Sequence, residues 1–287
     1  MLPKGRWYQE AVINGVKMPT RRDHDTNEER WNNFILPLVP KGTTFLELGC
    51  NAGFYLRKAV DLGFKATGIE KSRKYFRHAV YWETNDPKGV KLIRADLNSY
   101  NFSASSVVLL ANVHYWLTPL ELGSIVSKLS RKALYCIVVG RHRKLPTHKS
   151  PCDINSIKKS FVGWIEGKSI KGKKHYSIIF KNPDIEEVDT GILFRCEQSE
   201  KRKRLISAFQ KMIVGDNKEY IEYLKWRGFK GIRGWLRRRN KLIRSVKKHG
   251  IINPLNIYET RIIDGNHRLI LAHTLGLKTV LRTTLLG

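Results

Sequence analysis

The chain has 287 residues, with 53 Lys and Arg against 25 Asp and Glu, so its formal net charge at pH 7 is +28. Its content of hydrophobic residues, 41%, is enough for a sizeable core, which excludes disorder as the reason for the charge. The opening residues contain no apolar signal-peptide core, no run reaches the ~18 apolar residues of a membrane span, and the four cysteines lack zinc or disulfide spacing. We therefore expect a cytoplasmic protein of about two domains, with no membrane association and no metal.

A strand, a glycine turn and a helix follow one another early in the chain. Residues 43–48 are predicted to form a buried strand that enters the glycine turn 49–53, and residues 54–62 form an amphipathic helix. A second strand is expected at 65–69, closed by Glu70. In open α/β sheets, ligands bind beside such a turn, and an acidic residue after the second strand can bind ribose hydroxyls. The sequence therefore predicts a doubly wound α/β domain with a nucleoside-bearing ligand.

The glycine turn lacks the three-glycine spacing of the dinucleotide fingerprint. As Glu-Leu-Gly-Cys-Asn-Ala-Gly over residues 47–53, it resembles motif I of the class I S-adenosylmethionine-dependent methyltransferases, and the strands expected at 90–94 and 107–112 continue the resemblance. The resemblance implies a Rossmann-like methyltransferase domain over residues 1–197 with S-adenosylmethionine as cofactor. The residues that it implies for cofactor binding are Glu47, Gly49, Asn51, Gly53, Glu70, Asp96, Leu97 and Asn112. Glu70 would bind the ribose and Asp96 the adenine edge, and the glycines would let the backbone approach the cofactor.

The segment before the turn is similar to the lead-in of methyltransferases related to the tRNA wobble-uridine modifying group. The similarity rests on Trp7-Tyr8, Gly15, Pro19, Arg30-Trp31 and Leu36-Pro37. Its aromatic residues Trp7, Tyr8 and Trp31 are predicted either to cover the cofactor as a lid or to pack in the core.

The acceptor side carries fewer signals. After the fourth strand, residues 112–115 read Asn-Val-His-Tyr, without the two prolines of exocyclic amine methyltransferases, and the Pro-Cys pair at 151–152 comes too late for a cytosine-C5 enzyme. His114 is then the best candidate for a catalytic general base, because a neutral imidazole can accept a proton from a hydroxyl. The alternative is that His114 packs with Tyr115 and Trp116 as a wall of the binding site.

The end of this domain combines a basic loop with strands. A fifth strand is predicted at 134–139, followed by Arg141 and Arg143, which either contact a nucleic-acid phosphate or are merely solvated. Residues 176–180 and 192–196 alternate in polarity like an antiparallel strand pair.

The next segment is strongly basic. Residues 198–250 hold seventeen Lys and Arg against four Asp and Glu, interleaved with Trp226, Phe229 and Trp235. Such density predicts contact with the phosphates of RNA or DNA, since aromatic residues among cations can also stack on bases. The expected contacts are Lys201, Arg202, Arg204, Arg237, Arg238 and Arg239. A solvated helical face or an anionic membrane surface is the alternative. Residues 198–240 are predicted to be a basic helical connector.

The last part of the chain resembles the ParB/sulfiredoxin superfamily. The pattern is a helix from 241, Gly-Ile-Ile-Asn-Pro over 250–254, strands at 251–258 and 261–263, a helix at 267–275 and a strand at 279–285. The resemblance implies a small α+β domain over 241–287 that binds a nucleotide or phosphate. The residues that would do so are Asp264, Gly265, Asn266, His267 and Arg268.

This resemblance has two departures. Asn266 stands where sulfiredoxins have their catalytic Cys, which disfavours reductase chemistry, and the Glu-Arg-Arg of the partition proteins is absent, which puts CTP hydrolysis in doubt. Alternatively, Asp264 only caps the helix and pairs with Arg268. A helix-turn-helix over 242–258 is disfavoured by Pro254.

The sequence as a whole predicts an S-adenosylmethionine-dependent methyltransferase that acts on a nucleic acid or nucleotide-bearing substrate, with O-methylation among the reactions allowed. Two alternatives stay open. One is a nucleic-acid-binding ParB-like protein with a non-catalytic methyltransferase fold, and the other is a small-molecule or sugar O-methyltransferase.

Overall fold

The computed structural model gives the chain as two compact units. They are residues 1–101 with 105–183, and residues 102–104 with 184–287. The residues that the structure describes are 3, 6–20, 26–142, 147–149, 153–189, 200–228, 230–249, 255–258, 261–264, 269–272 and 279–284. The division at Pro183 precedes residue 198, so the expected basic connector lies in the same unit as the residues that follow it; the assignment of three domains stays a prediction.

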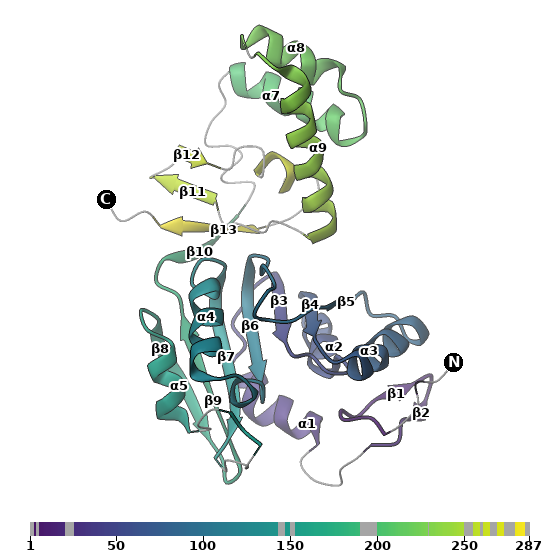
Figure 1. Ribbon diagram of the computed structural model, residues 1–287, viewed down its shortest axis with the longest axis vertical. Coiled ribbons are helices and arrows are strands. Elements are labelled where there is room, and N and C mark those ends of the chain that lie inside the picture. The colour runs from purple at the N-terminus through teal and green to yellow at the C-terminus, as the bar shows by residue number, and fades with distance from the viewer. Residues whose placement is uncertain are drawn as a thin grey trace. The chain divides into compact units, whose positions relative to one another are not determined.

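A mixed seven-stranded sheet forms the centre of the N-terminal unit (Figure 1). Its strands are β3 (Thr44–Leu48), β4 (Lys65–Glu70), β5 (Lys91–Arg94), β6 (Ser105–Ala111), β7 (Ala133–Arg141), β8 (Ile165–Lys171) and β9 (His175–Lys181). They lie in the order β5-β4-β3-β6-β7-β9-β8, with β3 to β7 parallel and the last two neighbours antiparallel. The order reverses between β3 and β6, and ligands of open α/β sheets bind at such a switch point. The strands predicted between residues 43 and 139 are confirmed.

Helices cover both faces of this sheet. They are α2 (Phe54–Asp61), α3 (Arg73–Asn85), α4 (Pro119–Leu129) and α5 (Ile154–Ser160). Right-handed crossovers put α2 and α3 on one face and α4 on the other, because the chain moves along the sheet in opposite directions on the two sides of β3. The side chains of Ser72, Thr118 and Asp153 cap the last three of these helices. Local signals therefore fix the helix starts.

One expected strand pair is wrong. Residues 176–180 were expected to pair with 192–196, but β9 pairs with β7 on one edge and β8 on the other, so neither of its edges is free for that pairing. Strand β8 carries no alternation that would have predicted it, because six of its seven residues are exposed at the sheet edge. Residues 192–196 themselves lie outside the described part of the chain.

The first residues of the chain pack at the end of the sheet where β3 and β6 finish (Figure 1). They form a hairpin of β1 (Val12–Ile13) and β2 (Val16–Lys17), then α1 (Asn27–Arg30), the π-helical turn η1 (Trp31–Ile35) and the 3-10 turn η2 (Leu36–Leu38). Trp7 stacks on His78 of α3, and Trp31 stacks on Tyr55 of α2. Both tryptophans are buried. These two tryptophans thus belong to the core, whereas Tyr8 is half-buried.

The C-terminal unit combines three helices with a small sheet. The helices are α7 (Glu200–Ile213), α8 (Lys218–Trp226) and α9 (Ile232–His249), and the strands are β10 (Ile185–Asp189), β11 (Leu255–Tyr258), β12 (Arg261–Asp264) and β13 (Thr279–Thr284). The sheet order is β10-β13-β11-β12, with only the β11–β13 pair parallel. Residues 269–272 are helical and buried, and pack with Phe209, Met212 and Tyr220 in the core. Within the described ranges, the predicted strands are confirmed, and no helix has the length and apolar character to cross a bilayer.

Candidate cofactor and acceptor site

The glycine turn after β3 is held against the end of β4. The amides of Gly49 and Cys50 both donate to the carbonyl of Ile69, at 2.8 and 3.0 Å, and the Gly53 amide donates to the Cys50 carbonyl at 2.9 Å. Gly49, Asn51 and Gly53 have φ values of 73°, 54° and 87°. This left-handed backbone turns the chain tightly from the strand into α2. The turn therefore sits at the switch point of the sheet.

Glu70 closes β4 and is bonded to this turn. One carboxylate oxygen accepts a hydrogen bond from the Asn51 amide at 2.9 Å, and the other accepts one from the Ser72 amide at 2.7 Å. Burial raises the pKa of Glu70, and its backbone hydrogen bonds act in the opposite direction. Each oxygen keeps a lone pair for a further donor. Glu70 is thus positioned beside the turn with capacity to accept ligand hydroxyls.

Three buried oxygens around the turn lack a hydrogen-bond partner among the described residues. They belong to the side chains of Glu47, Asn51 and Asn112. Burial, together with the nearby Glu70, raises the pKa of Glu47 well above its usual value. Asn112 follows β6 with a φ of 59°, a conformation that is uncommon for a residue other than glycine and that clusters at functional sites. Because buried polar atoms are normally paired, these oxygens fit a polar ligand such as S-adenosylmethionine.

We call Glu47, Gly49, Asn51, Gly53, Glu70 and Asn112 the cradle. Asp96 lies beside it, after β5, where the Ala95 amide donates to the Glu70 carbonyl at 3.2 Å. Its carboxylate pairs with Lys71 at 2.7 Å, and hydrogen bonds from Lys71 and Asn98 lower its pKa. Leu97 is buried next to it. The structure therefore brings all eight residues expected for the cofactor to the same edge of the sheet.

The two glycines of the cradle are required for different reasons. A Cβ atom added to Gly49 would lie 2.5 Å from a methyl group of Val113, so this side chain already fills the space above Gly49. A Cβ at Gly53 would meet nothing closer than Leu56 at 3.7 Å, which is ordinary contact. At Gly53 it is the left-handed backbone, and not space, that favours glycine.

His114 is completely buried after β6. Its Nε2 atom lies 3.2 Å from the Tyr176 hydroxyl, and its Nδ1 atom has no partner among the described residues. Burial, with a smaller contribution from His148, lowers the pKa of His114 to about 3. The imidazole is therefore neutral at physiological pH, but it is a weak base. Its role as general base stays a proposal.

Aromatic rings continue from His114 toward the surface. Tyr115 stacks on His148 with ring centres 4.0 Å apart, and Trp116 meets the same histidine edge-on at 5.2 Å. Trp116 is 49% exposed. These rings form a wall at the carboxyl end of β6, beside the cradle residue Asn112.

The expected phosphate contacts are only partly described. Arg141 ends β7, and its buried Nε atom has no partner in the described part of the chain. Arg143 lies outside the described residues, as do Gly265, Asn266, His267 and Arg268, whereas Asp264 ends β12. Lys201 and Arg202 lie in α7, but their side chains are not described.

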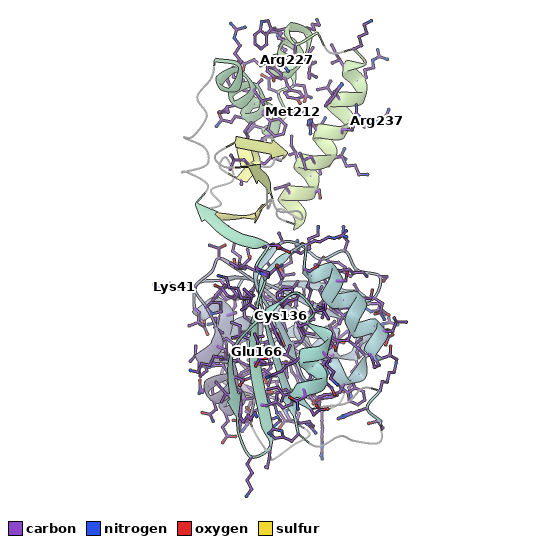
Figure 2. All side chains as sticks on the ribbon, turned by 90° about the vertical axis from the view of Figure 1, so that its left-hand side faces the viewer. Lys41, Cys136, Glu166, Met212, Arg227 and Arg237 are labelled. Carbon is purple, nitrogen blue, oxygen red and sulfur yellow. The ribbon has the colours of Figure 1, made fainter. Side chains whose placement is uncertain are left out.

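Three of the other expected phosphate contacts, Arg204, Arg238 and Arg239, lie against aromatic rings. Arg204 lies over Trp226 at 4.9 Å, and Arg238 and Arg239 lie over Trp235 at 4.6 and 5.4 Å. The Nε atom of Arg239 also donates to the Tyr220 hydroxyl at 3.2 Å. Arg237 points away from α9 (Figure 2).

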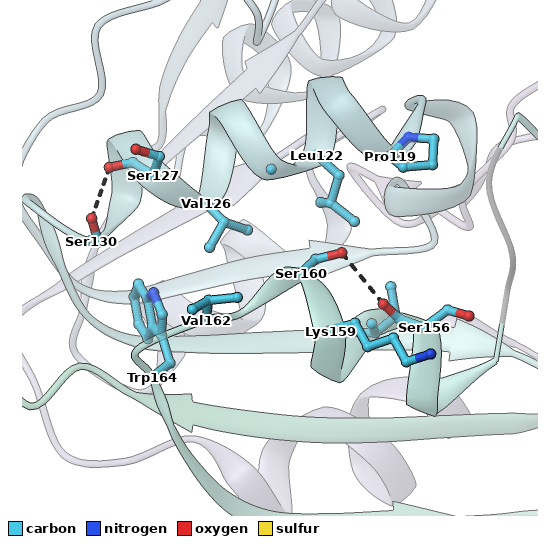
Figure 3. A pocket seen from close by; sticks show the side chains of 12 residues that line it. Pro119, Leu122, Val126, Ser127, Ser130, Ser156, Lys159, Ser160, Val162 and Trp164 are labelled. Carbon is cyan, nitrogen blue, oxygen red and sulfur yellow. Dashed lines mark hydrogen bonds between the residues drawn. The ribbon is translucent and has the colours of Figure 1, made fainter.

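A separate groove of 620 Å³ runs between α4 and α5 (Figure 3). Its lining includes Leu122, Val126, Val162 and Trp164, and it contains no residue of the cradle. The groove is therefore distinct from the predicted cofactor site.

Two cradle neighbours were not identified from the sequence as site residues. Gln9 accepts the Phe54 amide at 3.1 Å and so caps the start of α2, and Arg30 donates to the Tyr55 hydroxyl at 3.1 Å. Arg30 was noted only as part of the lead-in. A charged residue beside an aromatic one on a short helix is too common a pattern to indicate a contact 25 residues away.

No family model matches the chain, and no curated protein matches it. The sheet order and the cradle define a Rossmann-like α/β domain. A solved structure, the PH0226 protein from Pyrococcus horikoshii, has this fold with a TM-score of 0.50 at 14% identity, over 56% of this chain and 92% of that one.

Two methyltransferase structures also align. The TehB-like S-adenosylmethionine-dependent methyltransferase from Corynebacterium glutamicum has a TM-score of 0.42 at 13% identity, over 52% of this chain and 84% of that one. The N-methyltransferase NodS from Bradyrhizobium japonicum, in complex with S-adenosylhomocysteine, has a TM-score of 0.43 at 15% identity, over 50% and 79%. At these identities the likeness concerns the fold alone.

Proposed function

We propose that the chain is an S-adenosylmethionine-dependent methyltransferase. The observation that carries the proposal is the cradle: Glu70 is bonded to a left-handed turn at the switch point, next to the unpartnered buried oxygens of Glu47 and Asn112. Glu70 would accept hydrogen bonds from the ribose hydroxyls, Asp96 would face the adenine edge, and Glu47 would accept hydrogen bonds from the ammonium group. The cofactor supplies an electrophilic methyl group, so the protein has only to orient the acceptor and remove its proton.

The acceptor in this proposal is a nucleic acid or a nucleotide-bearing molecule. Helix α9 carries eight Lys and Arg and no Asp or Glu in 18 residues. Helices α7 and α8 differ, because there Lys211 pairs with Glu219. Cations without acidic neighbours on their own helix favour phosphate contacts over a solvated face of mixed charge. The exposed ring of Trp116 offers a stacking surface for a base.

The acceptor proton would be taken by His114. In this role the Nε2–H group donates to the Tyr176 hydroxyl, and Nδ1 carries no proton and can accept one. A neutral imidazole can take a proton from a hydroxyl, which fits O-methylation.

The C-terminal unit would add a phosphate or nucleotide site of ParB/sulfiredoxin type. Its support is the run of β12 up to Asp264, the helical residues 269–272 and the parallel pairing of β11 with β13. A turn between a strand and a helix start exposes amides to an anion. We place the protein in the cytoplasm as part of the same proposal.

The test is calorimetry of S-adenosylhomocysteine with the full chain, followed by transfer of a tritiated methyl group to RNA, DNA or a pool of small metabolites. We expect binding and label in a nucleic-acid fraction. Failure of the cofactor to bind would refute the enzyme, and nucleic-acid binding in its absence would favour a non-catalytic methyltransferase fold. Label in small molecules alone would instead identify a small-molecule O-methyltransferase.

A further inference from the structure

Among the residues that the structure describes, no carboxylate pairs with the buried guanidinium of Arg30. Arg30 ends α1, and only 9% of the residue is exposed. Its guanidinium donates through Nη1 to the Tyr55 hydroxyl at 3.1 Å and to the Asn27 side-chain oxygen at 3.4 Å, and its Nε atom has no partner among the described residues. Buried charges are nearly always paired, because leaving water is costly. Arg30 therefore has an unused capacity to bind an anion.

Arg57 shows what a satisfied buried arginine looks like in the same unit. It is 7% exposed, close to the value for Arg30. Its guanidinium pairs with Glu83 at 3.2 Å and with Asp86 at 2.5 Å. The ion pairs of the described residues include no such partner for Arg30.

The position of Arg30 connects it to the cradle. Tyr55 is the second residue of α2, directly after Gly53 and Phe54, and Tyr115 belongs to the 3-10 turn η3 (His114–Trp116), after β6. The guanidinium donates to the Tyr55 hydroxyl at 3.1 Å, and Tyr115 also lies near it. Arg30 thus lies between the segments that follow β3 and β6, at the edge where Figure 1 shows α1.

The hydrogen bonds around Tyr55 fix the guanidinium. The Tyr55 hydroxyl accepts from Arg30 and donates to the Asn27 side-chain oxygen at 3.3 Å. Trp31 stacks on the Tyr55 ring with centres 6.2 Å apart. The cation is therefore held in one orientation before any ligand arrives.

The amino-acid end of S-adenosylmethionine carries an ammonium and a carboxylate. Glu47 and Glu70 supply acceptor oxygens at the cradle, which suit the ammonium and the ribose hydroxyls, but no cradle residue carries a positive charge for the carboxylate. We infer that Arg30 binds the carboxylate of the cofactor's amino-acid portion, and that Tyr55 positions Arg30 for this contact. The inference rests on the proposed function. It assigns the one charged group of the cofactor that the cradle residues leave without a partner.

The test compares S-adenosylmethionine with its decarboxylated form, because the two ligands differ only in the carboxylate. Both are titrated by calorimetry into the full-length protein and into the variant Arg30→Met. We expect Arg30→Met to weaken S-adenosylmethionine binding by about 10- to 100-fold, the range for a hydrogen bond to a charged group, and to leave the decarboxylated ligand unaffected. Retained binding of the decarboxylated ligand also shows that the variant is folded.

Two further variants separate binding from packing. Arg57→Met removes an equally buried arginine that has its own carboxylates, so it should lower thermal stability without changing the ratio of the two affinities. Tyr55→Phe keeps the Arg30 guanidinium but removes its hydrogen bond to the Tyr55 hydroxyl. The affinity for S-adenosylmethionine relative to its decarboxylated form should therefore fall by less than in Arg30→Met. This variant also tests the inference if Arg30→Met does not fold.

The outcomes are distinct. Equal losses for both ligands in Arg30→Met, or no loss for either, would overturn the inference and leave Arg30 a structural residue. Absence of binding of either ligand to the unmodified protein would refute the proposed function instead.

Discussion

Glu47 combines complete burial with a carboxyl group that has an unpartnered oxygen. Burial and the neighbouring Glu70 raise its pKa well above the usual value. A carboxyl whose pKa is raised on folding binds its proton more tightly in the folded chain. Its contribution to stability is therefore present below the unfolded pKa of about 4.3 and is lost as the pH rises through the folded pKa.

Glu47→Gln should consequently stabilise the free protein and weaken cofactor binding. Glutamine cannot ionise, so we expect the melting temperature to exceed that of the unmodified protein by about 2–8 °C at pH 8, from about 1–2 kcal/mol, with a smaller gain at pH 5. The loss of a charged acceptor should weaken S-adenosylhomocysteine binding by about tenfold. Thermal melts at both pH values and calorimetry check this. A Glu47→Gln protein that is less stable than the unmodified protein at pH 8 would contradict the free-energy cost assigned to burying the Glu47 carboxylate.

His114 leads to a prediction about the pH profile. Because burial holds its pKa at about 3, the imidazole stays neutral from pH 5 upward. We expect kcat/KM of the unmodified enzyme to show no ionisation of His114 between pH 5 and 8. We expect His114→Gln to lower kcat by about 100-fold, the lower end for general acid–base catalysis, because so weak a base accepts a proton poorly. An ionisation near pH 6.5 that disappears in the variant would contradict the burial, and unchanged turnover would remove the catalytic role.

Residue roles could be predicted where they depend on contiguous sequence. Gly49, Gly53 and Glu70 follow from one strand, one turn and the next strand, and the structure puts them at one edge. Arg30 could not be predicted, because its position depends on how a separate segment packs on α2. The low pKa of His114 could not be predicted from the sequence either, because it depends on the burial of the ring next to Tyr176 and on the nearby His148.

At the scale of elements, the glycine turn and α4 allow a matched comparison. Gly53 has a φ of 87°, which costs another residue about 1–2 kcal/mol, whereas Gly123 lies inside α4 with nothing within 4 Å of an added Cβ. Gly53→Ala should therefore destabilise the protein by about 1–2 kcal/mol. Gly123→Ala should stabilise it by about 0.5–1 kcal/mol, because alanine favours the helix.

Differential scanning calorimetry of both variants checks the order of stability. Since an alanine methyl group fits at both positions, the difference isolates the backbone conformation. A Gly53→Ala protein as stable as the unmodified one would mean that the turn adopts another conformation in solution.

Elements buried on both faces were predictable, and the sheet edge was not. Strands β6 and β7 contain continuous apolar runs, and β3 and β4 are mostly buried and lie beside clear glycine turn signals. Strand β8 is mostly exposed and is defined by its hydrogen bonds to β9. Those bonds depend on which segment of the chain lies beside β9, and the polarity of the local sequence does not determine this.

At the scale of the whole molecule, the charge is unevenly divided along the chain. Helix α9 contributes eight cations, and Arg233, Arg237 and Arg238 are exposed on it, whereas Arg239 also bonds to Tyr220. This clustering of Lys and Arg could be predicted from the sequence alone, because it is a property of neighbouring residues and does not depend on the fold. That Arg239 bonds to Tyr220 could not be predicted from the sequence, because this contact depends on how α8 packs against α9.

The prediction is that exposed α9 cations set the salt dependence of nucleic-acid binding. Replacing Arg233, Arg237 and Arg238 with Gln should reduce the slope of log affinity against log salt by about 2–3, because each lost phosphate contact removes about 0.7–0.9. Fluorescence anisotropy with a short labelled RNA and a DNA duplex, between about 50 and 200 mM salt, measures the slope.

The matched control removes the same charge elsewhere. Lys41, Lys65 and Arg131 are exposed at the amino-terminal ends of β3 and β4 and before β7, on the side of the sheet opposite the cradle. Their triple replacement with Gln should leave the slope nearly unchanged, and neither triple should alter S-adenosylhomocysteine binding. Equal reductions by both triples would assign the effect to net charge alone, whereas an unchanged slope in the α9 triple would mean that this helix does not contact phosphates.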